Sequence, residues 1–285
     1  MSDALWPGGA RGALNLSFDN LGEAAEIELG AIGLDAELGE HFTATRVLPT
    51  ILQALESRGL EGTFFVEGLN AEIYPEALKS IDAGGHELAY HAWRHEQWGE
   101  LSAGEQAANL TRGLEGFGEL GLEMAGLRPP GGGLGAGGLD VLREAGLRYC
   151  SPAGEGAGAV DGIALLPFQW RHVDATCVLP PLGQVRERMS GSSDPLDPGA
   201  FLASLEGEVE SLAGDGGYMA IILHPFMLDW LGEDRFEALL DLVARASRRD
   251  EVWVARCAEV ADHVLAHPEP FRDGTALDST SWSDG

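Results

Sequence analysis

Short apolar runs alternate along this chain with longer segments in which apolar residues recur every three or four positions. Residues 218–223 form the most uniformly apolar run, which is typical of a strand buried on both faces. Residues 44–57 instead place Val47, Ile51 and Leu55 on one face of a helix. The alternation predicts strands at residues 13–18, 62–66, 87–90, 126–128, 148–151, 163–168, 173–179, 218–223 and 252–255, and helices at residues 44–57, 70–82, 102–120, 139–145, 199–213 and 233–247, with a last helix ending at residue 265.

Repeated strand–helix units of this kind predict an α/β fold whose parallel sheet closes, or nearly closes, into a barrel. Asn70 is expected to cap the helix that it begins. Two segments are expected to be loops, a long acidic connection at residues 21–41 and a polar, proline-bearing stretch at residues 183–198. No linker divides the chain, so we expect a single domain over residues 1–266 and a polar tail at residues 267–285 that frays.

The net charge of the chain limits the classes of partner that it is expected to bind. The 285 residues carry a formal net charge of −28, which repels nucleic acid and anionic membrane surfaces. We therefore expect a small-molecule partner and no binding to nucleic acid or membrane. A homo-oligomer is compatible with the sequence.

The three cysteines, Cys150, Cys177 and Cys257, are widely spaced and contain no Cys-x-x-Cys pair. They do not form a disulfide framework, and they fit a reducing compartment. No apolar run approaches the roughly 18–20 residues of a membrane span. Residues 1–15 lack the basic and apolar regions of a signal peptide, so a cytoplasmic location is expected.

Chemically useful side chains follow several predicted strands, and in a barrel such strand ends share one face. Two histidines four residues apart lie on one face of a helical turn and can reach the same metal ion. Each residue alone has a structural explanation: a helix cap, a surface ion pair, a core histidine or the start of a turn. Their order along the chain indicates a site, formed by Asp19 and Asn20 after the first strand, His91 and His95 after the third, Arg128 after the fourth and His224 after residues 218–223, with Asp174 as a further candidate.

These segments resemble the motifs of the polysaccharide deacetylases, the group that shares the chitooligosaccharide-deacetylase homology domain. Ser17–Asn20 is similar to the family's Thr/Ser-Phe-Asp-Asp motif, and His91–His95 to its His-x-x-x-His motif. Arg128–Gly132 is similar to Arg-x-Pro-x-Gly, and Leu223–Pro225 to Leu-His-Pro. The resemblance covers residues 13–242 and is greatest to the branch of certain peptidoglycan deacetylases and the cofactor-free allantoinases.

The resemblance implies a distorted (β/α)7-type barrel and hydrolysis of a non-peptide C–N amide bond, assisted by a divalent metal, with zinc expected. Trp170 and Asp174 resemble the fourth family motif only loosely. By position in the motifs, Asp19 is the general base, His224 the general acid, Arg128 and Asp174 orient these groups, and His91 and His95 hold the metal.

Asn20 departs from the family pattern, in which a second aspartate is the third metal ligand. An amide oxygen brings no charge and binds zinc less well than a carboxylate. Three outcomes are open: Asn20 is a weak ligand; Asp19, Glu23 or Glu26 supplies the oxygen; or the site works without metal. We favour a metal-capable site because both histidines are present.

Three functions follow. The leading one is deacylation, typically deacetylation, of a small intracellular N-acylated amine or amino-sugar derivative. The second is ring opening of a cyclic amide, imide or ureide, with or without metal. The third is a non-catalytic binding protein on a degenerate deacetylase scaffold. Candidate substrate-binding residues, which could equally be packing residues, are Trp93, Trp98, Pro130 and Trp170.

Overall fold

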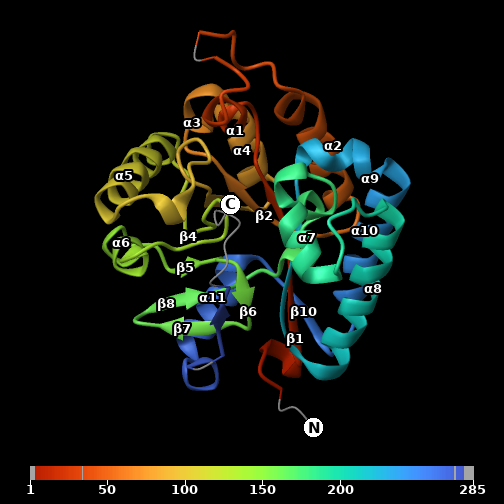
Figure 1. Cartoon of the computed structure of the whole chain (residues 1–285). Coiled ribbons are helices and arrows are strands. Elements are labelled where there is room, and N and C mark those ends of the chain that lie inside the picture. Colours follow the sequence, from red (N-terminus) through yellow and green to blue (C-terminus); the bar gives the residue numbers. More distant parts are fainter. Residues whose placement is uncertain (1–3, 34, 273, 279–285) are drawn as a thin grey trace.

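The computed structural model describes residues 4–33, 35–272 and 274–278, and it contains one curled sheet surrounded by helices (Figure 1). The sheet is parallel except at one edge. Its central strand, β1 (Gly12–Asp19), pairs along its length with β9 (Gly217–Leu223). The other edge of β1 pairs first with β10 (Val252–Val254) and then with β2 (Thr63–Val66). Beyond β2 the order is β3 (Glu87–Tyr90), β4 (Gly126–Leu127), β5 (Tyr149–Cys150), β8 (Ile163–Leu165) and the antiparallel β7 (Gly158–Val160).

The barrel is incomplete between β8 and β9, which confirms the distorted (β/α)7-type prediction. A single bridge, from Val173 to Ile222, joins this gap to β9. The strand predicted at residues 173–179 is wrong, because the chain turns into a 3-10 helix, η5 (Asp174–Cys177). The Asp174 carboxylate accepts hydrogen bonds from the backbone N–H groups of Ala175 and His224, and this fixes the turn.

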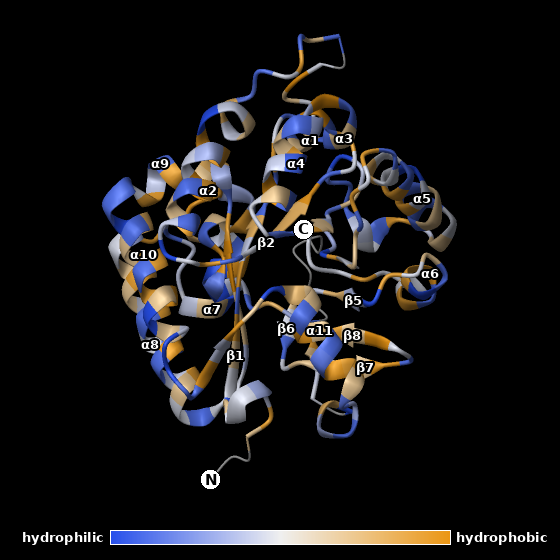
Figure 2. Cartoon of the chain, turned by 180° about the vertical axis from the view of Figure 1, so that it is seen from behind, coloured by the Kyte–Doolittle hydropathy of each residue, from blue (hydrophilic) through white to orange (hydrophobic). Residues whose placement is uncertain are grey.

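Alternation along β1 separates two layers of the core. Leu14, Leu16 and Phe18 pack outward against the helices. The intervening residues face the barrel interior, where the Asn15 amide donates to Thr63 Oγ1 at 3.1 Å. Asp19 continues this inward series, so the strand itself aims the carboxylate into the barrel. Apolar colour accordingly concentrates along the strands, and polar colour on the outer helix faces (Figure 2).

Most of the helices cover the outside of the sheet. Most lie where predicted, but α1 lies in the supposed acidic connection and α7 in the supposed loop at residues 183–198. Pro75 divides the helix predicted at residues 70–82, since its ring cannot continue a helix through Tyr74. The helices are α1 (Ala24–Glu28), α2 (Leu48–Glu56), α3 (Asn70–Ile73), α4 (Pro75–Ala83), α5 (Ala103–Glu119), α6 (Gly138–Glu144), α7 (Gly183–Ser190), α8 (Pro198–Asp215), α9 (Leu228–Leu231), α10 (Glu233–Ala246) and α11 (Cys257–Ala266).

Residues 267–272 and 274–278 are part of the fold, so the predicted fraying is wrong for them. Strand β11 (Ala276–Leu277) pairs antiparallel with β6 (Gly154–Glu155), and Phe271 packs against Trp6 with a ring separation of 5.1 Å. Residue 273 and residues 279–285 of the predicted tail lie outside the described residues.

The structure bears on two expectations that were drawn from the composition. The three cysteines are free and buried. Within the described residues, no helix has the length and apolar character needed to cross a membrane.

Candidate functional site

The histidine pair follows β3, but the predicted helical turn is wrong. Ala92 and His95 adopt positive φ angles of 63° and 75°, so residues 91–95 form a tight turn. Two backbone bonds fix that turn: Gly68 N–H donates to Ala92 O, and Leu69 N–H donates to Trp93 O. The two imidazole rings nevertheless lie together, with centroids 5.0 Å apart. This closeness fits the prediction that both rings face one point, although the backbone between them is a tight turn and not a helical turn.

Both rings are neutral at physiological pH. Burial lowers the pKa of His91 to about 3 and that of His95 to about 3, and the nearby His224 acts in the same direction. His91 Nδ1 lies 2.8 Å from the carbonyl oxygen of Arg128, which can only accept, so Nδ1 carries the proton. The His91 Nε2 lone pair is thereby left for a ligand.

Asp19 at the end of β1 is held by Arg128 at the end of β4. Arg128 Nη1 donates to Asp19 Oδ1 at 2.6 Å and to Ser17 Oγ at 2.8 Å, and the guanidinium also donates to Ser151 Oγ. The Arg128 side chain is 1% exposed and stands 3.9 Å from the ring centroid of Phe65. This buried pair fixes the direction of the carboxylate.

His224, at the end of β9, is held by Asp174. Its Nδ1 lies 2.6 Å from Asp174 Oδ1, while its backbone N–H donates to Oδ2 at 2.7 Å. Burial acts to lower the pKa of His224, but the charge of Asp174 and its hydrogen bond outweigh burial and raise that pKa. The ring therefore favours the protonated form, with Nε2 turned away from Asp174.

Asn20 is paired with Glu67, a residue that the sequence analysis missed. Asn20 Nδ2 donates to Glu67 Oε1 at 2.8 Å, and Glu67 Oε2 accepts from the Leu21 backbone at 3.2 Å and from Asn70 Nδ2 at 3.0 Å. Asn70 is thus not the predicted helix cap. Burial raises the pKa of Glu67 to about 8, against these hydrogen bonds. Glu67 could have been found, because it directly follows the apolar strand β2 as Asn20 follows β1.

By position in the motifs, the candidate metal donors are two imidazoles and one amide, since Oδ1 of Asp19 is already bound by Arg128. Within the described part of the chain, no group of three His, Cys, Asp or Glu residues could hold an ion. Glu23 accepts from Tyr74 Oη at 2.6 Å and from Gly39 N, and Glu26 lies 3.5 Å from His41, so neither carboxylate supplies the missing oxygen. With its Nδ2 bound to Glu67, Asn20 offers only Oδ1. This uncharged donor set fits a divalent ion that is held weakly.

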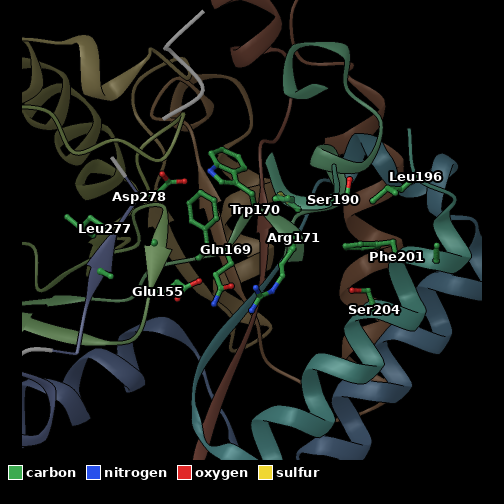
Figure 3. Close-up of a pocket in the computed structure, with 15 residues that line it drawn as sticks. Glu155, Gln169, Trp170, Arg171, Ser190, Leu196, Phe201, Ser204, Leu277 and Asp278 are labelled. Carbon is green, nitrogen blue, oxygen red and sulfur yellow. The ribbon is translucent and has the colours of Figure 1, made fainter. Parts of the chain in front are cut away.

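The four predicted substrate-binding residues lie in different surroundings: three are buried, and one lines a pocket. Trp98 is completely buried in the outer core, and Trp93 is buried with the Arg112 guanidinium 3.6 Å from its ring centroid, so both are packing residues. Pro130 is buried as well. Trp170, in the 3-10 helix η4 (Trp170–His172), is partly exposed and lines a pocket of about 660 Å³ (Figure 3).

Comparison with known proteins agrees with this geometry. Residues 32–150 match the family model described as polysaccharide deacetylase. A peptidoglycan-N-acetylglucosamine deacetylase of Bacillus cereus is 31% identical over 85 residues, which are 30% of this chain and only 31% of that protein.

Solved structures match over nearly the whole chain. A protein of Mycobacterium smegmatis assigned to the polysaccharide deacetylases is 26% identical, with a TM-score of 0.78 and 98% of each chain covered. Puue allantoinase is 19% identical, with a TM-score of 0.71 and coverage of 93% of this chain and 94% of that one, which shows a shared fold. The motif resemblance is thus confirmed: residues 32–150 match the polysaccharide deacetylase model, and the chain is similar over nearly its whole length to a protein assigned to that family.

Proposed function

We propose that this protein hydrolyses a non-peptide C–N amide bond and removes the acyl group, typically acetyl, from a small N-acylated amine or amino-sugar derivative. One observation carries the proposal. A carboxylate fixed by a buried arginine and an imidazole fixed by a buried aspartate lie at the same ends of neighbouring strands, β1 and β9. Such separately held acidic and basic groups suit a reaction that needs both.

In the proposed reaction, the Asp19 carboxylate takes a proton from water, and the water oxygen forms a bond to the amide carbonyl carbon. The C–N bond then breaks as protonated His224 gives its Nε2 proton to the departing nitrogen, which yields a carboxylic acid and an amine. Arg128 holds the Asp19 carboxylate in place, and Asp174 raises the pKa of His224 and so favours its protonated form. A divalent ion held by His91, His95 and Asn20 Oδ1 would supply polarisation of the carbonyl.

Asp19→Asn tests the base. We expect hydrolysis of N-acetylated amines, followed as acetate released, to fall by at least about 100-fold, in keeping with the loss of a general base. His224→Gln should give a similar loss through the acid. Circular dichroism and the melting temperature control for misfolding, since Asp19→Asn leaves the Arg128 charge unpaired. Equal rates for folded Asp19→Asn and wild type would reject the catalytic role of Asp19.

Ring opening of a cyclic amide, imide or ureide remains the second candidate, because Asn20 removes the carboxylate expected in a metal site. The two reactions differ in their products: deacylation releases two molecules and ring opening one. A substrate consumed without acetate or another free acid would favour ring opening. Activity that survives a chelator would reject a need for metal in either case. A protein that binds these amides and hydrolyses none would be the non-catalytic alternative.

A further inference from the structure

A pocket lies beside the proposed site, and its lining differs chemically from the site itself. We propose that it binds an apolar, ring-bearing substituent on the amine half of the amide substrate. This inference rests on the proposed function and adds a substrate class to it. The pocket volume of about 660 Å³ is in the range of roughly 300–1,000 Å³ typical of small-molecule sites.

One short segment connects the pocket with the catalytic groups. Phe168 lines the pocket, and its ring centroid lies 5.5 Å from the Arg128 guanidinium. Trp170 and Arg171 follow on the pocket wall, and Asp174, three residues later, holds His224. Because His224 gives its proton to the amine nitrogen in the proposed reaction, the amine half of the substrate faces this segment.

The pocket lining favours an apolar ring. Phe168 and Trp170 pack edge to face with ring centroids 5.0 Å apart, and Phe201 of α8 lies on the opposite wall (Figure 3). Met189 and Leu277, which are 41% and 46% exposed, also line the pocket. Among the described residues, Leu29 is the only other large apolar side chain that is this exposed. Exposed apolar side chains gathered around one hollow indicate a surface that a ligand covers.

The charges of the pocket argue against an anionic substituent. Arg171 is engaged by Glu208, with Nε 3.1 Å from a carboxylate oxygen. The other wall contributes the acidic residues Glu155 and Asp278. A carboxylate or phosphate on the amine would meet these acids, and the one arginine of the lining is already paired. A neutral aromatic or branched aliphatic group fits the lining better.

Ala200→Trp tests the pocket, because Ala200 lies exposed on α8 and lines it. The matched control is Ala203→Trp, an exposed position of the same helix that is not among the lining residues. The measurement is the ratio of kcat/KM for N-acetylphenethylamine to kcat/KM for N-acetylglucosamine. We expect wild type to favour the aromatic amide, and Ala200→Trp to lower the ratio at least tenfold through KM. Ala203→Trp should leave it unchanged. An unchanged ratio in Ala200→Trp would overturn the inference.

A binding measurement separates this inference from the proposed function. In the Asp19→Asn background, N-acetylphenethylamine should raise the melting temperature, and the added Ala200→Trp change should abolish that shift while Ala203→Trp retains it. This pattern without hydrolysis by wild type would support the pocket and reject the proposed function. Hydrolysis by wild type with no Ala200-dependent shift would retain the function and reject the pocket.

Discussion

Two buried ion pairs divide the acid and base roles between two residues. Asp19 sits against a permanent cation, Arg128, and His224 against an anion, Asp174. Arg128 fixes the direction of the Asp19 carboxylate, and Asp174 stabilises the imidazolium form of His224. The same site keeps His91 and His95 neutral through burial, with a pKa of about 3 for each ring. Three histidines of one site thus differ in charge because of their immediate neighbours.

Asp174→Asn is expected to change the pH dependence of hydrolysis. The raised pKa of His224 keeps the general acid protonated above pH 6.5, so the rate falls only as the pH rises through that raised value. Removing the Asp174 charge lowers the pKa of His224, and the alkaline limb of a kcat/KM profile between about pH 5 and 10 should move to lower pH. Asp161→Asn, at an exposed turn, is the control. A limb that stays in place would contradict the role of Asp174.

Because Asn20 pairs with Glu67, replacing Asn20 with the aspartate of the family pattern should destabilise the fold. Asn20→Asp would put a carboxylate oxygen in place of the Nδ2 that now lies 2.8 Å from Glu67 Oε1. At about pH 9, above the Glu67 pKa of about 8, the buried hydrogen bond is lost and two carboxylates meet, so we expect a decrease of about 1–3 kcal/mol in the free energy of unfolding. Adding Glu67→Gln supplies a donor again and should recover most of that loss.

The double variant also tests the metal site. Asn20→Asp/Glu67→Gln combines a charged third ligand with His91 and His95, so zinc should bind it at least tenfold more tightly than wild type in isothermal titration calorimetry. Glu67→Gln alone is the matched control. Zinc affinity equal to that of wild type, in a double variant that is folded, would mean that Asn20 does not face the histidines.

At the scale of elements, strand ends could be predicted and turns could not. Apolar runs located β1, β3, β4 and β9, and with them Asp19, His91, Arg128 and His224. The spacing of His91 and His95 does not distinguish a helical turn from a tight turn with positive φ. Helix α7 was missed because it depends on a side chain: buried Arg186 donates to the carbonyls of Thr176, Leu179 and Ser193. Contacts of that kind leave no periodicity in the sequence.

In helix α5, replacing glycine with alanine is expected to have opposite effects on the free energy of unfolding at Gly113 and at Gly118. Tyr90 Oη, at the end of β3, donates to Asn109 O of α5, and a Cβ at Gly113 would lie 2.2 Å from the Tyr90 ring. Gly113→Ala should therefore separate α5 from β3 and lower the free energy of unfolding by about 1–3 kcal/mol. Gly118 has no atom within 4 Å of a Cβ, so Gly118→Ala should raise it by about 0.5–1 kcal/mol. Urea denaturation measures both, and equal signs would contradict this packing.

At the scale of the whole molecule, charge of one sign opposes the compact state. The chain carries 46 acidic and 18 basic residues, for a net charge of −28. Many arginines are already engaged in surface ion pairs, such as Arg249 with Glu210 at 2.7 Å and Arg94 with Glu28 at 3.0 Å. Exposed pairs of this kind contribute only about 0–1 kcal/mol each. The excess of acidic groups therefore leaves a repulsion that local pairing does not offset.

Salt should accordingly stabilise this protein at neutral pH. Raising NaCl from about 0.01 to 0.5 M shortens the screening length from about 30 Å to a few ångströms, which weakens repulsion across the whole surface more than attraction within contact pairs. We expect the melting temperature at pH 7.5 to rise by roughly 2–6 °C, equivalent to about 1–2 kcal/mol for a chain of this size. The same series at pH 4.5, close to the isoelectric point of about 4.4, is the control, because the net charge there is near zero. A fall in melting temperature with salt at pH 7.5 would mean that the ion pairs, and not the net charge, dominate the electrostatic free energy of this fold.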